Sequence, residues 1–272
     1  MEKAEAAKRK NIILGLTLAL NLGILFVFKY LNFFVYTGRA AGNIFGVAIP
    51  LKDISLVAPM GLSFYTLQVV GYLLDVSRGT CRAEKGLLRY ALFAGFFPQL
   101  VQGPINRYSD LAETLYLPKK FNYEQVTFGL QRMLWGLFKK LVIAERMSVI
   151  VGTIYGDFET YSGLYIVVGT VCFAFQLYTD FSGAMDIALG LSEALGIRMA
   201  ENFDNPFFAR SISEYWRRWH ITLGTWMKDY VFYPLLKSNL FVSIGDRAKN
   251  RLGKKKGKRF LHIWVWQCSG LQ

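Results

Sequence analysis

Four long runs without a charged residue divide the chain. They cover residues 11–28, 54–74, 90–106 and 160–179, and each holds 17 to 21 residues. A helix of about 20 apolar residues crosses the hydrocarbon core of a bilayer. The pattern therefore predicts an all-α, polytopic integral membrane protein. The composition agrees. Hydrophobic residues make up 53% of the chain, against roughly 45–50% apolar residues in soluble domains, and the mean hydropathy is +0.27.

Prolines and glycines interrupt some of these runs, namely Pro59, Pro98, Pro104, Gly95 and Gly103. A broken helix at membrane depth needs protein or water around it. We therefore expect kinked or re-entrant helices around a central cavity, with the FFPQLVQGP stretch (96–104) as the main candidate. An ordinary span with a proline kink explains the same residues.

The net charge of +13 follows the membrane pattern. Lysines and arginines cluster before the first run, after the second and near the end of the chain, as the positive-inside rule requires. This predicts a cytoplasmic N-terminus, cytoplasmic loops at 75–89 and 237–259, and an external loop at 37–50. The KKKGKR stretch (254–259) is expected to contact anionic lipid headgroups, so no nucleic-acid partner is predicted.

The chain is thus interpreted as a single membrane domain, 1–272, in consecutive parts. A basic cytoplasmic lead (1–10) precedes apolar spans and re-entrant segments (11–195). An aromatic and basic helix (202–236), the basic loop (237–259) and the start of a further helix (260–272) follow.

The helix predicted at 202–236 contains one of the two histidines of the chain, His220. Ser211 with Glu214 three residues later is typical of a capping box, which fixes where this helix begins. The pattern places His220 in its middle and predicts that the helix lines a cavity or the membrane interface. Residues that could line the cavity or contact substrate are Trp216, Arg217, Trp219 and Trp226. From composition alone, a hydrogen-bonded structural histidine explains His220 as well.

Two acidic residues, Asp180 and Asp186, lie in or beside apolar sequence, where ionisable groups are usually paired or functional. Gln176 lies one helical turn before Asp180. Neighbouring lysines or arginines are expected to neutralise the acids. A role in substrate binding remains the alternative for both, with Asp180 and Gln176 as the candidate substrate or cavity residues.

Other chemistries find no support in the sequence. His220 and His262 are 42 residues apart without a zinc-binding spacing, so no metal site is predicted. Cys81, Cys172 and Cys268 suggest neither a disulfide framework nor a redox motif. No glycine-rich phosphate loop is present.

Five segments together resemble a known family. They are LGLTLALNLGILFVFKYLNFF (14–34), APMGLSFYTLQVVGYLLDVSRG (58–79), FFPQLVQGPINRYSDL (96–111), YTDFSGAMDIALGL (178–191) and PFFARSISEYWRRWHITLGTWMKDYVFYP (206–234). The last resembles the signature segment of the membrane-bound O-acyltransferases, in the bacterial branch that acts in alginate O-acetylation and teichoic acid D-alanylation. One departure is Ala184-Met185, where members more often have Tyr-Ser.

The resemblance implies acyl transfer to a hydroxyl and identifies His220 with one of two histidine positions of related enzymes. The other lies in a downstream Gly-Leu-Trp-His-Gly motif, of which residues 269–271 resemble only the beginning, and His262 is interpreted as an interfacial residue. Members also carry further apolar segments at the N-terminal side. The chain is therefore expected to be part of a longer enzyme and inactive alone.

The resemblance also implies substrates and partners. The acyl donor is expected to be acetyl-CoA or another thioester or carrier, used on the cytoplasmic side of a bacterial inner membrane, with no bound cofactor. The acceptor is expected to be an alginate-type polysaccharide or an extracellular SGNH-type transfer partner. Alternatives are D-alanyl transfer to teichoic acid, a polytopic transporter and an inactive remnant.

Overall fold

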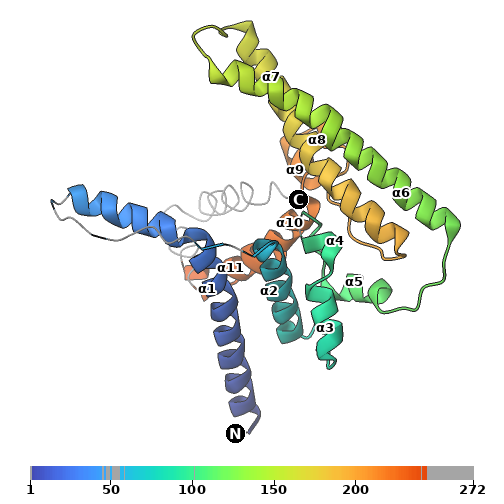
Figure 1. Ribbon diagram of the computed structural model, residues 1–272. Coiled ribbons are helices and arrows are strands. Elements are labelled where there is room, and N and C mark those ends of the chain that lie inside the picture. The colour runs from blue at the N-terminus through green and yellow to red at the C-terminus, as the bar shows by residue number, and fades with distance from the viewer. Residues whose placement is uncertain are drawn as a thin grey trace, which may run out of the picture. The chain divides into compact units, whose positions relative to one another are not determined.

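The computed structural model describes residues 2–44, 46, 50, 56–57, 59–100, 102–239 and 241–243 (Figure 1). Its regular elements within these ranges are all helices, which confirms the predicted all-α class. The chain forms two compact units, one of residues 1–101 and 107–109 and one of residues 102–106 and 110–272, and each is described by itself. The predictions for 254–259, His262 and Cys268 concern residues outside the described ranges.

The first unit contains α1 (Glu2–Ile44), α2 (Leu62–Arg78), α3 (Leu87–Ala94) and α4 (Phe97–Leu100). The long helix α1 includes a stretch, Lys8–Ile44, that is long and apolar enough to cross a membrane. Two predicted boundaries are therefore wrong. The basic lead is already helical from Glu2, and residues 37–44 of the predicted external loop belong to the same helix. No proline interrupts the sequence before Pro50, so nothing in the backbone ends the helix earlier.

The apolar runs at 54–74 and 90–106 do not form single long helices. Within the first run the helix α2 begins only at Leu62, after Gly61 in the left-handed conformation (φ 73°), and the second is divided between α3 and α4. At that break, the side-chain amide of Gln99 donates from Nε2 to the carbonyl of Phe93 at 2.7 Å. The interruption predicted for the 96–104 stretch is therefore confirmed.

The second unit is built on two long antiparallel helical segments. One consists of α6 (Tyr123–Leu137), the π-helix η1 (Phe138–Ala144) and α7 (Glu145–Gly156), which follow one another without a break, and the other is α8 (Leu164–Ala194) (Figure 1). The helix α8 is the second element that is long and apolar enough to cross a membrane. The short helix α5 (Tyr108–Leu115) precedes this pair in the sequence.

Glycines allow these two segments to approach closely. A Cβ atom on Gly129 would lie 2.5 Å from the carbonyl oxygen of Gly190, and one on Gly136 would lie 2.6 Å from the carbonyl oxygen of Gly183. Both pairs therefore place backbone against backbone. The glycines are seven residues apart on each helix, so both contacts fall on the same face.

Five short elements follow α8 within the described residues: η2 (Pro206–Phe208), α9 (Ile212–Arg218), α10 (Ile221–Met227), the π-helix η3 (Lys228–Phe232) and α11 (Tyr233–Leu236), which continues directly from η3. They replace the single helix predicted for 202–236.

Candidate functional site

His220 lies at a break between two helices, so its predicted position in the middle of a helix is wrong. Trp219 is extended (φ −102°, ψ 125°), and His220 is left-handed (φ 46°, ψ 53°). Such a conformation is uncommon for a residue other than glycine and persists where its surroundings hold it.

The preceding loop explains the break. The amide of Asp204 donates to the carbonyl of Arg218, and the amide of Ile221 donates to the carbonyl of Asn202, both at 3.0 Å. Phe203 and Trp219 pair as an isolated antiparallel bridge. These contacts with the loop take the place of hydrogen bonds that a continuous helix would make.

The start predicted for this segment is confirmed. Ser211 is the N-cap of α9, and its hydroxyl accepts a hydrogen bond from the amide of Glu214 at 3.1 Å. The Glu214 carboxylate in turn accepts from the amide of Arg210 at 2.8 Å and pairs with Arg218 at 2.6 Å. The backbone amide of Arg210 contributes most to lowering the pKa of Glu214, and the positive charges of Arg218 and Arg217 lower it further.

Asn202 is the centre of the polar contacts around His220. Its side chain is completely buried, and its Oδ1 lies 3.1 Å from His220 Nδ1. The same oxygen accepts hydrogen bonds from the amide of Thr222 at 3.1 Å and from its hydroxyl at 2.9 Å. The Thr222 hydroxyl accepts from the amide of Ile105 at 3.1 Å, which connects the 102–106 segment to this cluster.

An aromatic ring also packs against His220. The ring of Phe181, on α8, meets it edge to face with centroids 4.8 Å apart. His220 lies outside both of the long apolar helices, and burial lowers its pKa to about 4, opposed by a hydrogen bond to its own backbone. The imidazole is therefore neutral at ordinary pH and able to accept a proton.

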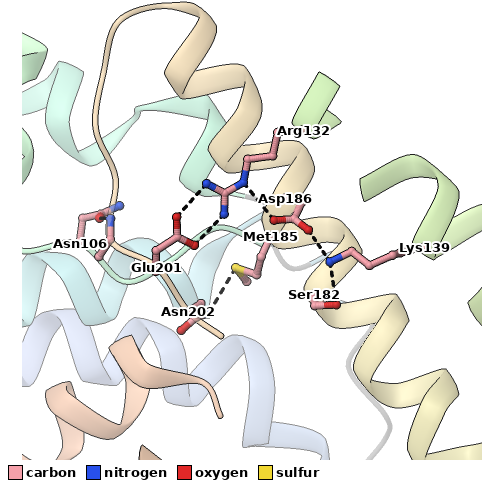
Figure 2. Close-up of polar contacts among 9 residues, drawn as sticks. Asn106, Arg132, Lys139, Ser182, Met185, Asp186, Glu201 and Asn202 are labelled. Carbon is pink, nitrogen blue, oxygen red and sulfur yellow. Dashed lines mark hydrogen bonds and ion pairs between the residues drawn. The ribbon is translucent and has the colours of Figure 1, made fainter. Parts of the chain in front are cut away.

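A second polar cluster lies between α8 and the α6–η1 segment, and Figure 2 shows its ion pairs. Asp186 pairs with Arg132 at 3.0 Å and also with Lys139, whose ammonium group donates to the Ser182 hydroxyl at 3.1 Å. Arg132 also contacts Glu201, the residue before Asn202. The cluster thus neutralises an acid inside the helix pair and ties it to the loop that carries Asn202.

The predicted neutralisation of the two acids is confirmed, since Asp180 pairs with Lys140. Lys139 and Lys140 both lie in the π-helix η1, and a π-helical turn of this kind is often found at functional sites. The Gln176 side-chain oxygen is buried and has no hydrogen-bond partner within the described ranges.

The side chains shown in contact with the His220 ring, Asn202 and Phe181, are not among the predicted site residues. The ring of Trp219 stacks on Tyr215 with centroids 5.7 Å apart and also contacts Tyr178 and Phe203. Trp216 and Arg217 are exposed on α9. Trp226 packs against Tyr230.

Sequence reasoning missed Asn202, Arg132, Lys139 and Glu201. Arg132 and Lys139 are seven residues apart, a spacing that places both on one helix face. This spacing could have indicated them as partners for the acids of α8. Nothing local to Asn202 indicates its contact with His220, which is 18 residues away.

The sequence matches a known protein family. Residues 82–245 match the sequence profile of MBOAT, the membrane-bound O-acyltransferase family. A probable alginate O-acetylase of Azotobacter vinelandii is 36% identical over 227 residues, which are 82% of this chain and 44% of that protein.

Two further relatives are named for other acyl transfers. A peptidoglycan O-acetyltransferase of Helicobacter pylori is 31% identical over 256 residues, 85% of this chain and 47% of that protein. A teichoic acid D-alanyltransferase of Bacillus subtilis is 27% identical over 180 residues, 65% of this chain and 46% of that protein. The chain thus spans a little less than half the length of these relatives.

Proposed function

The chain belongs to the membrane-bound O-acyltransferase family, and from this premise we propose that it forms the His220-bearing part of an enzyme that O-acetylates a polysaccharide at the cell surface. The observation that carries the proposal is a neutral, half-buried histidine at a helix break, held by Asn202. That arrangement lies within the residues that match the family.

The chemistry needs a base at the acceptor hydroxyl. As the hydroxyl oxygen attacks the acyl carbon of a thioester, a new C–O bond forms and the C–S bond breaks. The hydroxyl proton passes to the neutral imidazole of His220 and then to the departing thiolate, so the histidine is restored. A histidine whose pKa lies below neutrality holds the free lone pair that the first step requires.

Relatives favour acetyl transfer to a glycan. The alginate and peptidoglycan O-acetylating relatives are 36% and 31% identical to this chain, and the D-alanyltransferase is 27% identical. We propose acetyl-CoA or another thioester as the donor, used from the cytoplasmic side. The acceptor would be the polysaccharide itself or an extracellular SGNH-type protein that passes the acetyl group on.

The remaining parts of the proposal concern location. The basic residues of the N-terminal ten positions and of the 75–89 loop support a multi-pass protein of a bacterial inner membrane with a cytoplasmic N-terminus. The apolar helices Lys8–Ile44 and Leu164–Ala194 provide candidate spans.

The test is substitution of His220 in the product of the native gene, expressed in a strain without its chromosomal copy. Acetate and D-alanine released from the surface polymers by alkali are measured together. We expect His220→Gln to lower acetate roughly a hundredfold or more without reducing the amount of protein in the membrane. Full acetate release from this variant would refute the proposed role, and loss of D-alanine alone would reassign the acyl group.

A further inference from the structure

We propose that Asn202 is the positioning residue of this site: its side-chain oxygen accepts a hydrogen bond from Nδ1–H of His220, which leaves the lone pair on Nε2 as the atom that takes the proton. The inference rests on the proposed function, because it concerns the base of that reaction. It assigns a role to a residue that does not itself touch the substrate.

The orientation of the Asn202 amide follows from its neighbours. A backbone N–H group only donates, so the atom that the Thr222 amide meets at 3.1 Å is the Asn202 oxygen and not its nitrogen. That same oxygen lies 3.1 Å from His220 Nδ1. Because a carbonyl oxygen only accepts, Nδ1 carries the hydrogen in the neutral ring, and Nε2 is then the unprotonated nitrogen.

The Thr222 hydroxyl is consistent with this assignment. It accepts from the amide of Ile105 at 3.1 Å, so its own hydrogen is free to point at Asn202 Oδ1, 2.9 Å away. Three donors thus converge on one oxygen. An amide turned the other way would place its NH₂ group against the backbone N–H of Thr222, an unfavourable contact between two donors in a buried site.

Asn202 is itself held in place from several sides. Its NH₂ group lies 3.3 Å from the sulfur of Met185 on α8. The residue before it, Glu201, binds Arg132 through two hydrogen bonds. Two residues before it, the amide of Ala200 donates to the side chain of Asn106 at 2.9 Å. Figure 2 shows Met185, Glu201 and Arg132 near Asn202. These contacts leave the acceptor that faces His220 little freedom to move.

The His220 ring is fixed by the same surroundings. Its backbone is left-handed at φ 46°, the Asn202 oxygen meets one nitrogen, and the Phe181 ring contacts it edge to face. A base that is oriented before substrate arrives avoids the cost of ordering it during the reaction. The hydrogen bond that selects the tautomer is therefore part of what makes the histidine an effective base.

The tautomer can be read directly by NMR. The native gene product is labelled with ¹⁵N-histidine in detergent, and the His220 signals are those absent from the His220→Gln variant. We expect a protonated Nδ1 and an unprotonated Nε2 in the unaltered protein, and a mixture of tautomers in Asn202→Leu. Asn122→Leu is the matched control, because it also removes an asparagine oxygen that accepts a backbone hydrogen bond, at the N-cap of α6. A hydrogen on Nε2 in the unaltered protein, or an unchanged tautomer in Asn202→Leu, would overturn the proposal.

Acyl transfer supplies the second measurement. We expect Asn202→Leu to lose between about tenfold and the roughly hundredfold expected when the base itself is removed, while Asn122→Leu keeps its activity. Asn202→Asp keeps the acceptor oxygen and adds a negative charge, which favours the imidazolium. In the Asn202→Asp variant, the fall of kcat/KM at low pH should therefore begin at a higher pH than in the unaltered protein. A purely structural role of Asn202 would not produce this change.

The outcomes separate the two proposals. Full transfer by His220→Gln refutes the proposed function, whatever tautomer the spectra give. Loss of transfer in His220→Gln together with full transfer in Asn202→Leu refutes the positioning role alone. If Asn202→Leu does not accumulate in the membrane, the pH profile of Asn202→Asp is the test. An acid limb of kcat/KM at the same pH as in the unaltered protein would overturn the inference.

Discussion

The guanidinium of Arg132 on α6 faces the carboxylate of Glu201 through two parallel hydrogen bonds, 2.7 Å from Nη1 to Oε1 and 2.6 Å from Nη2 to Oε2. The same guanidinium donates from Nε to Asp186 on α8 at 3.0 Å. One side chain therefore joins the helix pair to the loop that presents Asn202 to His220. Only arginine offers this fork of donors.

The two pairs made by Arg132 should differ in strength. Glu201 is 57% exposed and Asp186 is 16% exposed, so water screens the first pair more. Double-mutant cycles to alanine, measured by unfolding in detergent, should give Arg132–Glu201 a coupling energy of at most about 1 kcal/mol. Arg132–Asp186 should give a larger value, up to about 3 kcal/mol. Equal couplings would contradict the expected effect of burial on the two pairs.

The glycine contacts between α6 and α8 should tolerate no side chain. Gly136→Ala would place a methyl group 2.6 Å from the Gly183 oxygen, a backbone atom that cannot move aside. We expect this variant to be poorly folded, measured as the fraction that stays monodisperse in detergent. Gly152→Ala on α7 is the control, because a Cβ atom there meets nothing within 4 Å. The control should be neutral or gain up to about 1 kcal/mol from helix propensity, and equal damage in both variants would count against the close packing.

The rate of acyl transfer should persist to unusually low pH for a reaction that uses a histidine base. Burial disfavours the imidazolium and lowers the pKa of His220 from 6.5 to about 4, so the ring remains neutral as pH falls from 7 to about 5. The acid limb of kcat/KM should therefore lie near 4. A limb near 6.5 would mean that the ring is solvated in the working enzyme.

The same shift predicts how the free energy of unfolding depends on pH. The folded pKa is depressed, so the unfolded chain binds the proton first, below about 6.5, and stability falls as pH drops from there through about 4. His220→Gln should remove this part of the pH dependence, which unfolding measurements between pH 4 and 7 would detect. An identical pH dependence in both proteins would exclude the contribution.

The loop at 75–89 should be cytoplasmic, because clustered positive charge resists translocation. We propose labelling Lys85→Cys in intact cells with an impermeant thiol reagent, in a background without native cysteines, since Cys81 lies in the same loop. Lys85→Cys should react only after the cells are opened, whereas Asn43→Cys, on the side predicted to be external, should react in both cases. Ready labelling of Lys85→Cys in intact cells would reverse the topology.

The sequence by itself predicted the features that depend on neighbouring residues. The helical class, the interruption near Gly95 and the cap formed by Ser211 all follow from apolar runs, breakers and capping residues read over a few positions, and the structure confirms each. The acids of α8 were also expected to find cations, because an ionisable group in apolar surroundings needs a partner.

Only the tertiary structure decided which residues meet. The partners of Asp186 lie on another helix, with Arg132 54 positions away in the chain. The local pattern around His220 favours an unbroken helix, yet the helix stops there because Asn202 and Asp204 from the preceding loop take over its hydrogen bonds. Local preference for a helix amounts to a few tenths of a kcal/mol per residue, so several buried hydrogen bonds from a distant segment override it.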